Sequence, residues 1–382
     1  MLLPSRTRGL KAFIGSGTFL DTFLLSPFCT GHNMPLRTES FRIGTLIRCM
    51  LFMVITLVEI HGGTTARALD LFPSEDALDK YRRSWTPITH GSLLIPVAET
   101  PPKGRLILSS FVFGQVGDGQ YHNTLTTRVS AAPVNTNSAV PGGMVIYGLT
   151  DYVSMGAGLS GIYWKSTDAA GEHNSTTGLG DTSLFLNTLH RVQDPETWQP
   201  SFSLYHRISL PTSHWAGTQP PPGGFEAFSI RPSTRFGALS LTEGLVVTKN
   251  FRPVRVSSAI YYTYNTPGSQ FGGTETAYVG DLLDVRMSLE HVFHEDRGFG
   301  VLLGALVRQG LPYRLDGHDL NVSPVNFSLI GVSAGLEYRF TPNLLANVGC
   351  LFTVAGQNDV HAFYPGLSIK YSWDGLRASI GQ

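Results

Sequence analysis

Apolar and polar residues alternate along the chain between Asn326 and Phe340. Every second position is apolar and contributes to one face, which carries Ile330, Val332, Ala334, Leu336, Tyr338 and Phe340. The intervening positions are small or charged: Gly331, Ser333, Gly335, Glu337 and Arg339. A period of two residues predicts a β-strand with one apolar face. Such a face contacts a dry core in a soluble sandwich and contacts lipid in a transmembrane barrel.

Similar runs, separated by turn-forming residues, recur from Lys103 to the end of the chain. We count twelve, over residues 103–115, 143–151, 153–165, 180–191, 200–210, 232–248, 253–265, 277–293, 298–309, 326–340, 342–354 and 363–373. Runs 232–248 and 298–309 alternate poorly, and Leu302 and Leu306 fall on the polar side of the second. The pattern predicts an all-β protein.

The connections between these runs alternate in length. Short connections contain Asp151-Tyr152, Asp194-Pro195-Glu196, Asn250-Phe251-Arg252, Glu295-Asp296-Arg297 and Thr341-Pro342. Longer ones cover residues 116–142, 166–179, 211–231, 266–276, 310–325 and 355–362. Short turns on one rim and long loops on the other are typical of an antiparallel up-and-down transmembrane β-barrel. Since only a closed sheet satisfies its backbone in lipid, we predict a barrel of about twelve strands with both ends on the short-turn side.

The register predicts which side chains face the interior of this barrel. The inward charged residues are Arg207, Arg255, Asp284, Arg286, Glu290, Arg308, Glu337, Arg339 and Lys370. A lysine or arginine near the bilayer midplane costs roughly 2–4 kcal/mol on the lipid face, so energy also favours the inward placement. These charges would line a polar passage, or would form ion pairs that fill a closed barrel.

Aromatic residues gather at the short-turn ends of the predicted strands. They are Phe293, Tyr338, Phe340, Tyr371 and Trp373. Amphipathic rings prefer the membrane–water boundary, so we predict a membrane-interface girdle there. The general preference of aromatic residues for strands is the alternative explanation.

An export signal precedes the strands. Arg37, Arg42 and Arg48 come before the apolar run 49–60, and Ala66-Arg67-Ala68 follows it. This arrangement is typical of a cleavable signal peptide. We therefore predict an N-terminal extension and signal over residues 1–68, a periplasmic or plug segment over 69–102, and the barrel over 103–382. Within the second part, residues 74–81 read as a short capped helix.

Composition excludes several classes of function. Charged residues make up 15% of the chain and the formal net charge is zero, so no basic surface predicts a nucleic-acid partner. Cys350 is the one cysteine after the predicted cleavage site, which excludes disulfide and zinc frameworks. The histidines lie without metal-ligand spacing, and the sequence contains no cofactor motif or Gly-x-Ser-x-Gly elbow. We predict a protein with no metal, no cofactor and no enzymatic activity.

Two short motifs carry a family resemblance. A Gly-x-Gly-Asp opens one strand and a Leu-Pro-Thr corner ends the next, at Gly178, Gly180, Asp181, Leu210, Pro211 and Thr212. They resemble motifs of the outer-membrane channel family named after the meta-cleavage pathway of phenol degradation, although Ser213 replaces the family's glycine. The hairpin at 239–264 is also similar to that family, but lacks an asparagine often found there.

The resemblance implies an outer-membrane channel for small, often aromatic, organic compounds, with no catalytic residues. It predicts a bacterial outer-membrane location after export through the periplasm. The expected partners are lipid, a small organic solute and the barrel-assembly machinery; the sequence gives no signal for an oligomeric state. A closed structural or adhesive barrel and a barrel-embedded lipid hydrolase are the alternatives. The final residues, Ala-Ser-Ile-Gly-Gln, lack the terminal aromatic of many such barrels.

Overall fold

The computed structural model describes residues 72–87, 95, 97–122, 124–127, 129–130, 135–167, 173–212, 214–217, 230–231, 239–270, 275–278, 281–294, 298–310, 314–316, 327–357 and 359–374. The predicted signal peptide lies outside these residues. The described part begins with one helix, α2 (Glu75–Arg83), and continues almost entirely as strands. In the first half these are β1 (Leu106–Tyr121), β2 (Val129–Ser130), β3 (Asn135–Gly148), β4 (Val153–Thr167), β5 (His173–Leu179), β6 (Thr182–Arg191), β7 (Ser201–Leu210), β8 (His214–Gly217) and β9 (Ile230–Arg231).

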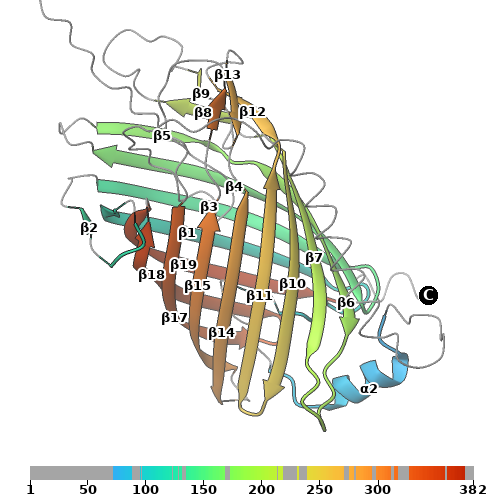
Figure 1. Cartoon of the computed structure of the whole chain (residues 1–382). Coiled ribbons are helices and arrows are strands. Elements are labelled where there is room, and N and C mark those ends of the chain that lie inside the picture. The colour runs from blue at the N-terminus through green and yellow to red at the C-terminus, as the bar shows by residue number, and fades with distance from the viewer. Residues whose placement is uncertain are drawn as a thin grey trace, which may run out of the picture.

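The second half contributes ten further strands. They are β10 (Ser240–Phe251), β11 (Val254–Asn265), β12 (Pro267–Gln270), β13 (Glu275–Tyr278), β14 (Leu282–His294), β15 (Phe299–Gly310), β16 (Arg314–Asp316), β17 (Phe327–Thr341), β18 (Leu344–Gln357) and β19 (Val360–Trp373). Strands β12, β13 and β16 form a separate three-stranded sheet beyond the long-loop ends of the others (Figure 1).

The large sheet closes on itself as an antiparallel barrel (Figure 1). Its first long strand, β1, pairs with the last, β19, so that Leu106 lies opposite Trp373. On its other side β1 pairs with β3. Strands β5 and β6 follow one another as one interrupted strand of the barrel wall, and so do β7 and β8. Counted in this way, the barrel has twelve strands. The predicted fold class is therefore confirmed.

Both ends of the barrel sequence lie on the rim that carries the short turns. Leu106 and Trp373 begin and end the barrel there, and the two-residue turns 252–253 and 342–343 join hairpins on the same rim. The prediction that residues 166–179 and 355–362 are loops was wrong: β5 occupies 173–179, and β18 and β19 leave only 358–359 between them. Neither stretch has an apolar face, because both are rich in small and polar residues.

Side chains alternate between the outside and the inside of the barrel. Along β10 the exposed and buried positions alternate from Ser240 to Val246, although the sequence pattern there was poor. This strand covers 240–251 in place of the predicted 232–248, whose first seven residues lie outside the described part. Leu302 and Leu306 do point inward, and both are buried.

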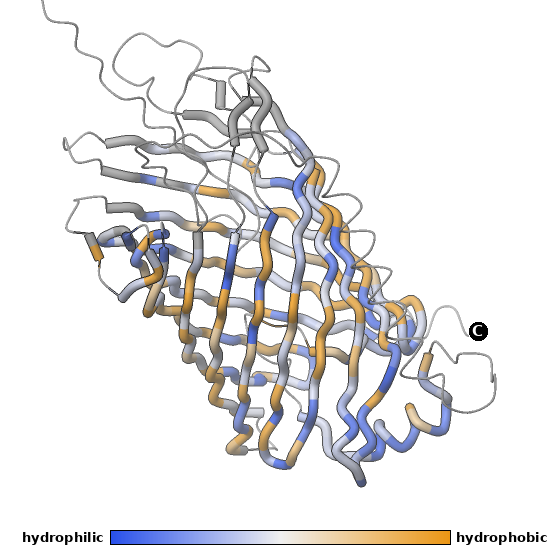
Figure 2. The backbone as a smooth tube through the Cα atoms, in the orientation of Figure 1, coloured by the Kyte–Doolittle hydropathy of each residue, from blue (hydrophilic) through white to orange (hydrophobic). Residues whose placement is uncertain are grey.

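The outer surface of the barrel is apolar. Figure 2 shows hydrophobic positions recurring along the strands of the wall. On β14 the outward side chains are Leu283, Val285, Met287 and Leu289, and all are exposed. Monomeric soluble proteins rarely expose a continuous apolar surface of this extent. The wall of this barrel therefore matches an apolar surrounding medium better than water.

Helix α2 lies at one side of the short-turn rim, next to the end of β6 (Figure 1). Ser74 caps it as predicted, since its Oγ accepts a hydrogen bond from the backbone N–H of Ala77 at 3.3 Å. Leu78 is buried against Leu189 and Val192 at the end of β6. On the polar side, Lys80 Nζ lies 2.8 Å from Asp194 Oδ1 in the β6–β7 turn. The helix is thus held to the rim by an apolar cluster and by ion pairs.

Candidate functional site in the barrel interior

A buried ionic cluster links β14 and β15 on the inner face of the wall. Arg308 donates from Nε to Asp284 Oδ1 at 2.6 Å and from Nη2 to Asp284 Oδ2 at 2.8 Å. Arg286 donates to the same Oδ2 at 2.6 Å. Asp284 and Arg308 are direct partners in the strand register, which explains why two inward side chains meet. The predicted inward residues Asp284, Arg286 and Arg308 thus form one group, named here the upper cluster.

A second cluster lies nearer the short-turn rim. Arg255 Nη1 donates to Glu290 Oε2 at 3.0 Å, and these residues are also register partners. On β17, separated from β14 only by β15, Glu337 accepts a hydrogen bond from Asn347 Nδ2 at 2.9 Å. The charges of Glu337, Glu290 and Arg255 all act on Lys370. Four predicted inward residues therefore belong to this group, named here the lower cluster.

Arg339 has a different environment. Its guanidinium donates to the backbone carbonyls of Thr341 at 3.1 Å and Pro342 at 3.2 Å in the β17–β18 turn. Arg339 therefore lies at the short-turn rim, where its guanidinium binds the turn that joins β17 to β18. The nine predicted residues therefore divide among an upper cluster, a lower cluster, Arg339 on the rim, and Arg207, which is described next.

An aromatic row that sequence reasoning missed follows the inner wall. The rings of Phe185 and Tyr205 stack with centroids 6.0 Å apart, and Tyr205 meets Tyr261 edge-on at 5.7 Å. Arg286 of the upper cluster places its guanidinium carbon 4.9 Å from the centre of the Tyr261 ring. Beside the row, Arg207 Nη2 donates to Thr242 Oγ1 at 3.2 Å. The alternation on each strand predicts that these side chains face inward, but it does not predict that they contact one another.

The segment before β1 contacts the interior face of the wall. The carbonyl of Pro87 accepts a hydrogen bond from Arg255 Nη2 at 3.3 Å. The backbone N–H of Ala98 donates to the buried Thr248 Oγ1 at 3.0 Å. Ile95 and Ala98 are completely buried in a cluster that includes Val246, Ala259 and Tyr261 of the inner wall. Pro87, Ile95 and Ala98 therefore contact the inner wall, whereas α2 lies at the rim.

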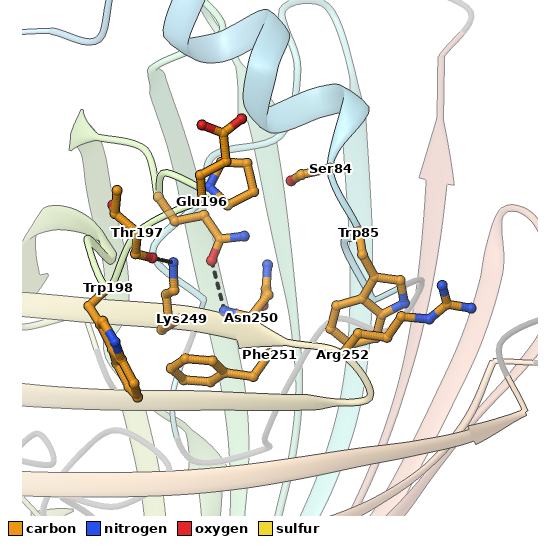
Figure 3. A pocket seen from close by; sticks show the side chains of 11 residues that line it. Ser84, Trp85, Glu196, Thr197, Trp198, Lys249, Asn250, Phe251 and Arg252 are labelled. Carbon is orange, nitrogen blue, oxygen red and sulfur yellow. Dashed lines mark hydrogen bonds between the residues drawn. The ribbon is translucent and has the colours of Figure 1, made fainter.

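A pocket opens at the short-turn rim, between this segment and the adjacent turns. It has a volume of about 390 Å³, and Trp85, Trp198, Phe251 and Arg252 are among its lining residues (Figure 3). Lys249 Nζ donates to the carbonyls of Asp194, Thr197 and Gln199 at 2.7–3.1 Å. Figure 3 shows the bond to Thr197. All three ammonium donors of Lys249 are thereby engaged, so this lysine fixes the turn rather than offering a charge to a ligand.

Electrostatics at the rim support the docking of α2. The carboxylates of Asp194 and Glu196 accept hydrogen bonds from Lys80 and raise the pKa of its ammonium group above the ordinary 10.5. In return, Lys80 lowers the pKa of Asp194 below its ordinary value of 3.8. Arg82 adds a contact with Asp151 Oδ2 at 3.1 Å in the β3–β4 turn.

The predicted girdle residues all have exposed side chains. Their exposed fractions are 39% for Tyr338, 43% for Tyr371, 46% for Trp373, 55% for Phe293 and 60% for Phe340. All five lie toward the short-turn ends of β14, β17 and β19, on the outer face. Their assignment to a membrane boundary stays a prediction.

The residues of the family motif meet at one bend in the wall. Gly180 separates β5 from β6, and its N–H donates to the carbonyl of Ser160 on β4 at 2.7 Å. Thr212, just past the end of β7, accepts a hydrogen bond from the N–H of Thr182 at 2.8 Å. Asp181 is buried at this bend, whereas Leu210, Pro211 and Thr212 form the corner that joins β7 to β8. The two motifs therefore build one structural feature.

Groups that could hold a metal ion are lacking in the described part of the chain. Among the residues that the structure describes, no helix is long and apolar enough to cross a membrane.

No family model and no curated protein sequence matches the chain. Solved structures do match, and their likeness concerns the fold. An outer membrane channel from Pseudomonas putida F1 aligns with 72% of this chain and 98% of its own, with a TM-score of 0.57 and 13% identity. The transport unit of the autotransporter AIDA-I from Escherichia coli has a TM-score of 0.47 at 11% identity, covering 75% of this chain and 96% of its own. A mutant of TodX, a monoaromatic hydrocarbon channel, scores 0.35 at 11% identity, covering 72% and 91%.

The last two scores are too low to support an argument. The first shows that the chain shares its closed barrel architecture with a known membrane-channel protein. The class defined here is therefore the twelve-stranded antiparallel β-barrel.

Proposed function

We propose that the chain is a bacterial outer-membrane channel that passes small organic compounds, aromatic ones among them. One observation carries the proposal: the barrel is apolar outside and charged inside, the reverse of a soluble fold. On β14 this inversion is visible within three residues, because Leu283 and Val285 are exposed while Asp284 between them is 4% exposed. Lipid around the wall explains the outward side chains, and a polar passage explains the inward ones.

Three features support the finer parts of this proposal. The fold resembles that of a solved outer membrane channel. The bend of Gly180 and Thr212 carries the motif residues that resemble the phenol-degradation family. The aromatic side chains on the inner wall offer surfaces on which organic rings can stack. The proposed partners are outer-membrane lipid, a small organic solute and the barrel-assembly machinery, and no catalytic role is assigned.

A closed barrel is the second candidate, and the close packing of the interior at one height of the barrel favours it. Arg308, Glu290 and Glu337 are no more than 2% exposed, and Ile95 and Ala98 pack against the inner wall. A permanently filled interior would conduct nothing. We propose instead that the segment containing Ile95 and Ala98 is a plug that leaves the passage when solute crosses.

Three measurements test the channel. Cell fractionation and heat-modifiable gel mobility establish whether the expressed chain is an outer-membrane barrel. Liposomes that contain the purified protein are then diluted into isotonic solutions of small aromatic or aliphatic solutes, and swelling reports passage. We expect membrane localisation and swelling above that of empty liposomes. A water-soluble monomer would overturn the proposal. So would swelling equal to that of empty liposomes for every solute, both for the parent protein and for a variant that lacks the segment containing Ile95 and Ala98.

A further inference from the structure

Two glycines create space for the aromatic row on the inner wall. Gly244 on β10 lies between Tyr205 and Tyr261 in the strand register. A Cβ on Gly244 would lie 2.4 Å from Cδ1 of the Tyr261 ring, and one on Gly156 would lie 2.3 Å from Cζ of Phe185. No real Cβ contact is that short, so both rings lie flat against bare backbone. The row therefore depends on glycine at these two positions.

Three guanidinium groups lie beside the row. Arg286 and Arg308 both donate to Asp284, and Arg207 Nη2 donates to Thr242 Oγ1. Guanidinium groups gathered at one part of the wall favour an anionic solute over a cationic one.

Exposure separates the residues that can meet a solute from those that support them. Tyr205, Arg207 and Arg286 are partly exposed. Behind them, Tyr261, Asp284 and Arg308 are buried, at 5%, 4% and 1% exposure. Arg286 lies against the ring of Tyr261, and Arg207 lies on the same strand as Tyr205, so guanidinium groups and tyrosine rings line one part of the inner wall. A guanidinium matches the geometry of a carboxylate, and a tyrosine ring stacks with another ring.

We propose that Phe185, Tyr205, Tyr261, Arg207 and Arg286, named here the aromatic–arginine patch, bind small aromatic carboxylates. The ring of the solute lies against Tyr205, and its carboxylate accepts hydrogen bonds from Arg207 and Arg286. This assignment rests on the proposed channel function and narrows its substrate class to aromatic acids. Tyr205 also packs against the cluster that contains Ile95, so the bound solute lies next to the proposed plug.

The test measures how solutes block ion current through the purified full-length processed protein in a planar bilayer. Benzoate carries both a ring and a carboxylate. Cyclohexanecarboxylate lacks the aromatic ring, and benzyl alcohol lacks the charge. We expect benzoate to reach half-block at a concentration about tenfold below either comparator, since a charge-assisted hydrogen bond and a ring contact each contribute on that scale.

Variants assign the block to the patch. Arg207→Gln and Arg286→Gln each raise the half-blocking concentration of benzoate and of cyclohexanecarboxylate. Tyr205→Leu and Gly244→Ala remove the preference for benzoate over cyclohexanecarboxylate and leave the charge. Arg339→Gln is the matched control: it makes the same substitution at the rim turn, and we expect the block to be unchanged. Heat-modifiable gel mobility shows that each variant is folded.

The outcomes separate the patch from the channel. If the protein conducts but benzoate blocks no better than both comparators, or if the patch variants behave like Arg339→Gln, the patch proposal is overturned and the rings merely cover Gly156 and Gly244. If no current is seen, the channel proposal has failed in that assay, and ligand-observed NMR with benzoate and detergent-solubilised protein decides the patch. Binding that Arg207→Gln abolishes supports it, and absence of binding overturns it.

Discussion

Asp284 and Arg308 form a two-point ion pair inside the barrel wall, with both carboxylate oxygens accepting hydrogen bonds from one guanidinium at 2.6 and 2.8 Å. The side chain of Arg308 is 1% exposed and that of Asp284 is 6% exposed. Removing one partner from such a pair leaves an uncompensated charge where water cannot reach it. Losing either partner should therefore weaken the contact between β14 and β15.

Asp284→Asn should destabilise the folded barrel by about 3–5 kcal/mol, the usual cost of breaking a buried pair from one side. The loss is measured as a shift of the denaturant midpoint in detergent, followed by tryptophan fluorescence. Asp374→Asn is the matched control, because Asp374 meets Arg105 at the same 2.6 Å but is 50% exposed. Its cost should stay below about 1 kcal/mol. Equal shifts for the two variants would contradict the role given to the buried pair.

Gly180→Ala should strain the bend between β5 and β6. A Cβ there would lie 2.6 Å from Ser160 Oγ and 3.2 Å from the Ser160 carbonyl oxygen. Crowding of this kind usually costs about 1–3 kcal/mol, and we expect a loss of that size in the denaturant midpoint. Ser160→Ala removes the closer atom and should restore part of the loss. Gly143→Ala is the control, since its nearest neighbour would lie at 3.5 Å. A loss at Gly143 as large as that at Gly180 would refute the steric explanation.

The barrel could be predicted from the sequence because apolar lipid-facing residues and polar interior-facing residues alternate along each strand with a period of two. That period places Asp284 and Arg308 inward independently of one another. It does not reveal that they meet, because their contact depends on the register between β14 and β15 across a 24-residue separation. The same reason hid the row of Phe185, Tyr205 and Tyr261. The contact between Tyr205 and Tyr261 also requires Gly244 on the strand between them, and no pattern within a single strand marks that position.

Other elements were missed because they lack an apolar face. Strand β5 has the sequence HNSTTGL, which offers no hydrophobic alternation. Its strand structure comes from pairing with β4 and β8, a tertiary effect. The segment before β1 was predicted as either a plug or a periplasmic extension, because its prolines indicate extended chain without a location. The burial of Ile95 and Ala98 supports the plug, which stays a proposal.

The attachment of α2 should depend on pH. The lowered pKa of Asp194 means that its ion pair stabilises the attachment above the ordinary carboxyl value of 3.8 and is lost as pH falls through the lower folded-state pKa. The raised pKa of Lys80 means that its contribution is present below 10.5 and is lost as pH rises through the higher folded-state value. The helix should therefore be held between these limits and released outside them.

A spin label at the exposed Asp76 measures this release through its mobility. We expect restricted motion at neutral pH and free motion at the acidic and alkaline extremes, on barrels that stay folded by gel mobility. Lys80→Met should give greater mobility at neutral pH and should remove most of the pH dependence. If the label in the Lys80→Met protein titrates as in the parent protein, Lys80 and Asp194 do not control the docking of α2.

The proposed plug can be locked in place through Ala98 and Thr248. The 3.0 Å hydrogen bond between Ala98 N and Thr248 Oγ1 brings the two positions within reach of a cross-link. The test protein carries A98C and T248C, with Cys350→Ser to remove the native thiol. If the segment leaves the interior during passage, oxidation should suppress solute swelling or ion current several-fold, and a reductant should restore it. Thr248→Val, which deletes the acceptor but leaves the chain free, should raise the passage rate above that of the parent protein.

Two comparisons make the cross-link result decisive. The single variant T248C in the same background controls for the oxidant, which should leave its passage unchanged. Mass spectrometry confirms that the double variant forms its bond, so an unaffected rate cannot be assigned to incomplete cross-linking. Equal passage by the oxidised and reduced double variant would show that the segment stays inside while solute crosses. Ile95 and Ala98 would then be fixed parts of the inner wall, and the route would run beside them, past Tyr205 and Arg207.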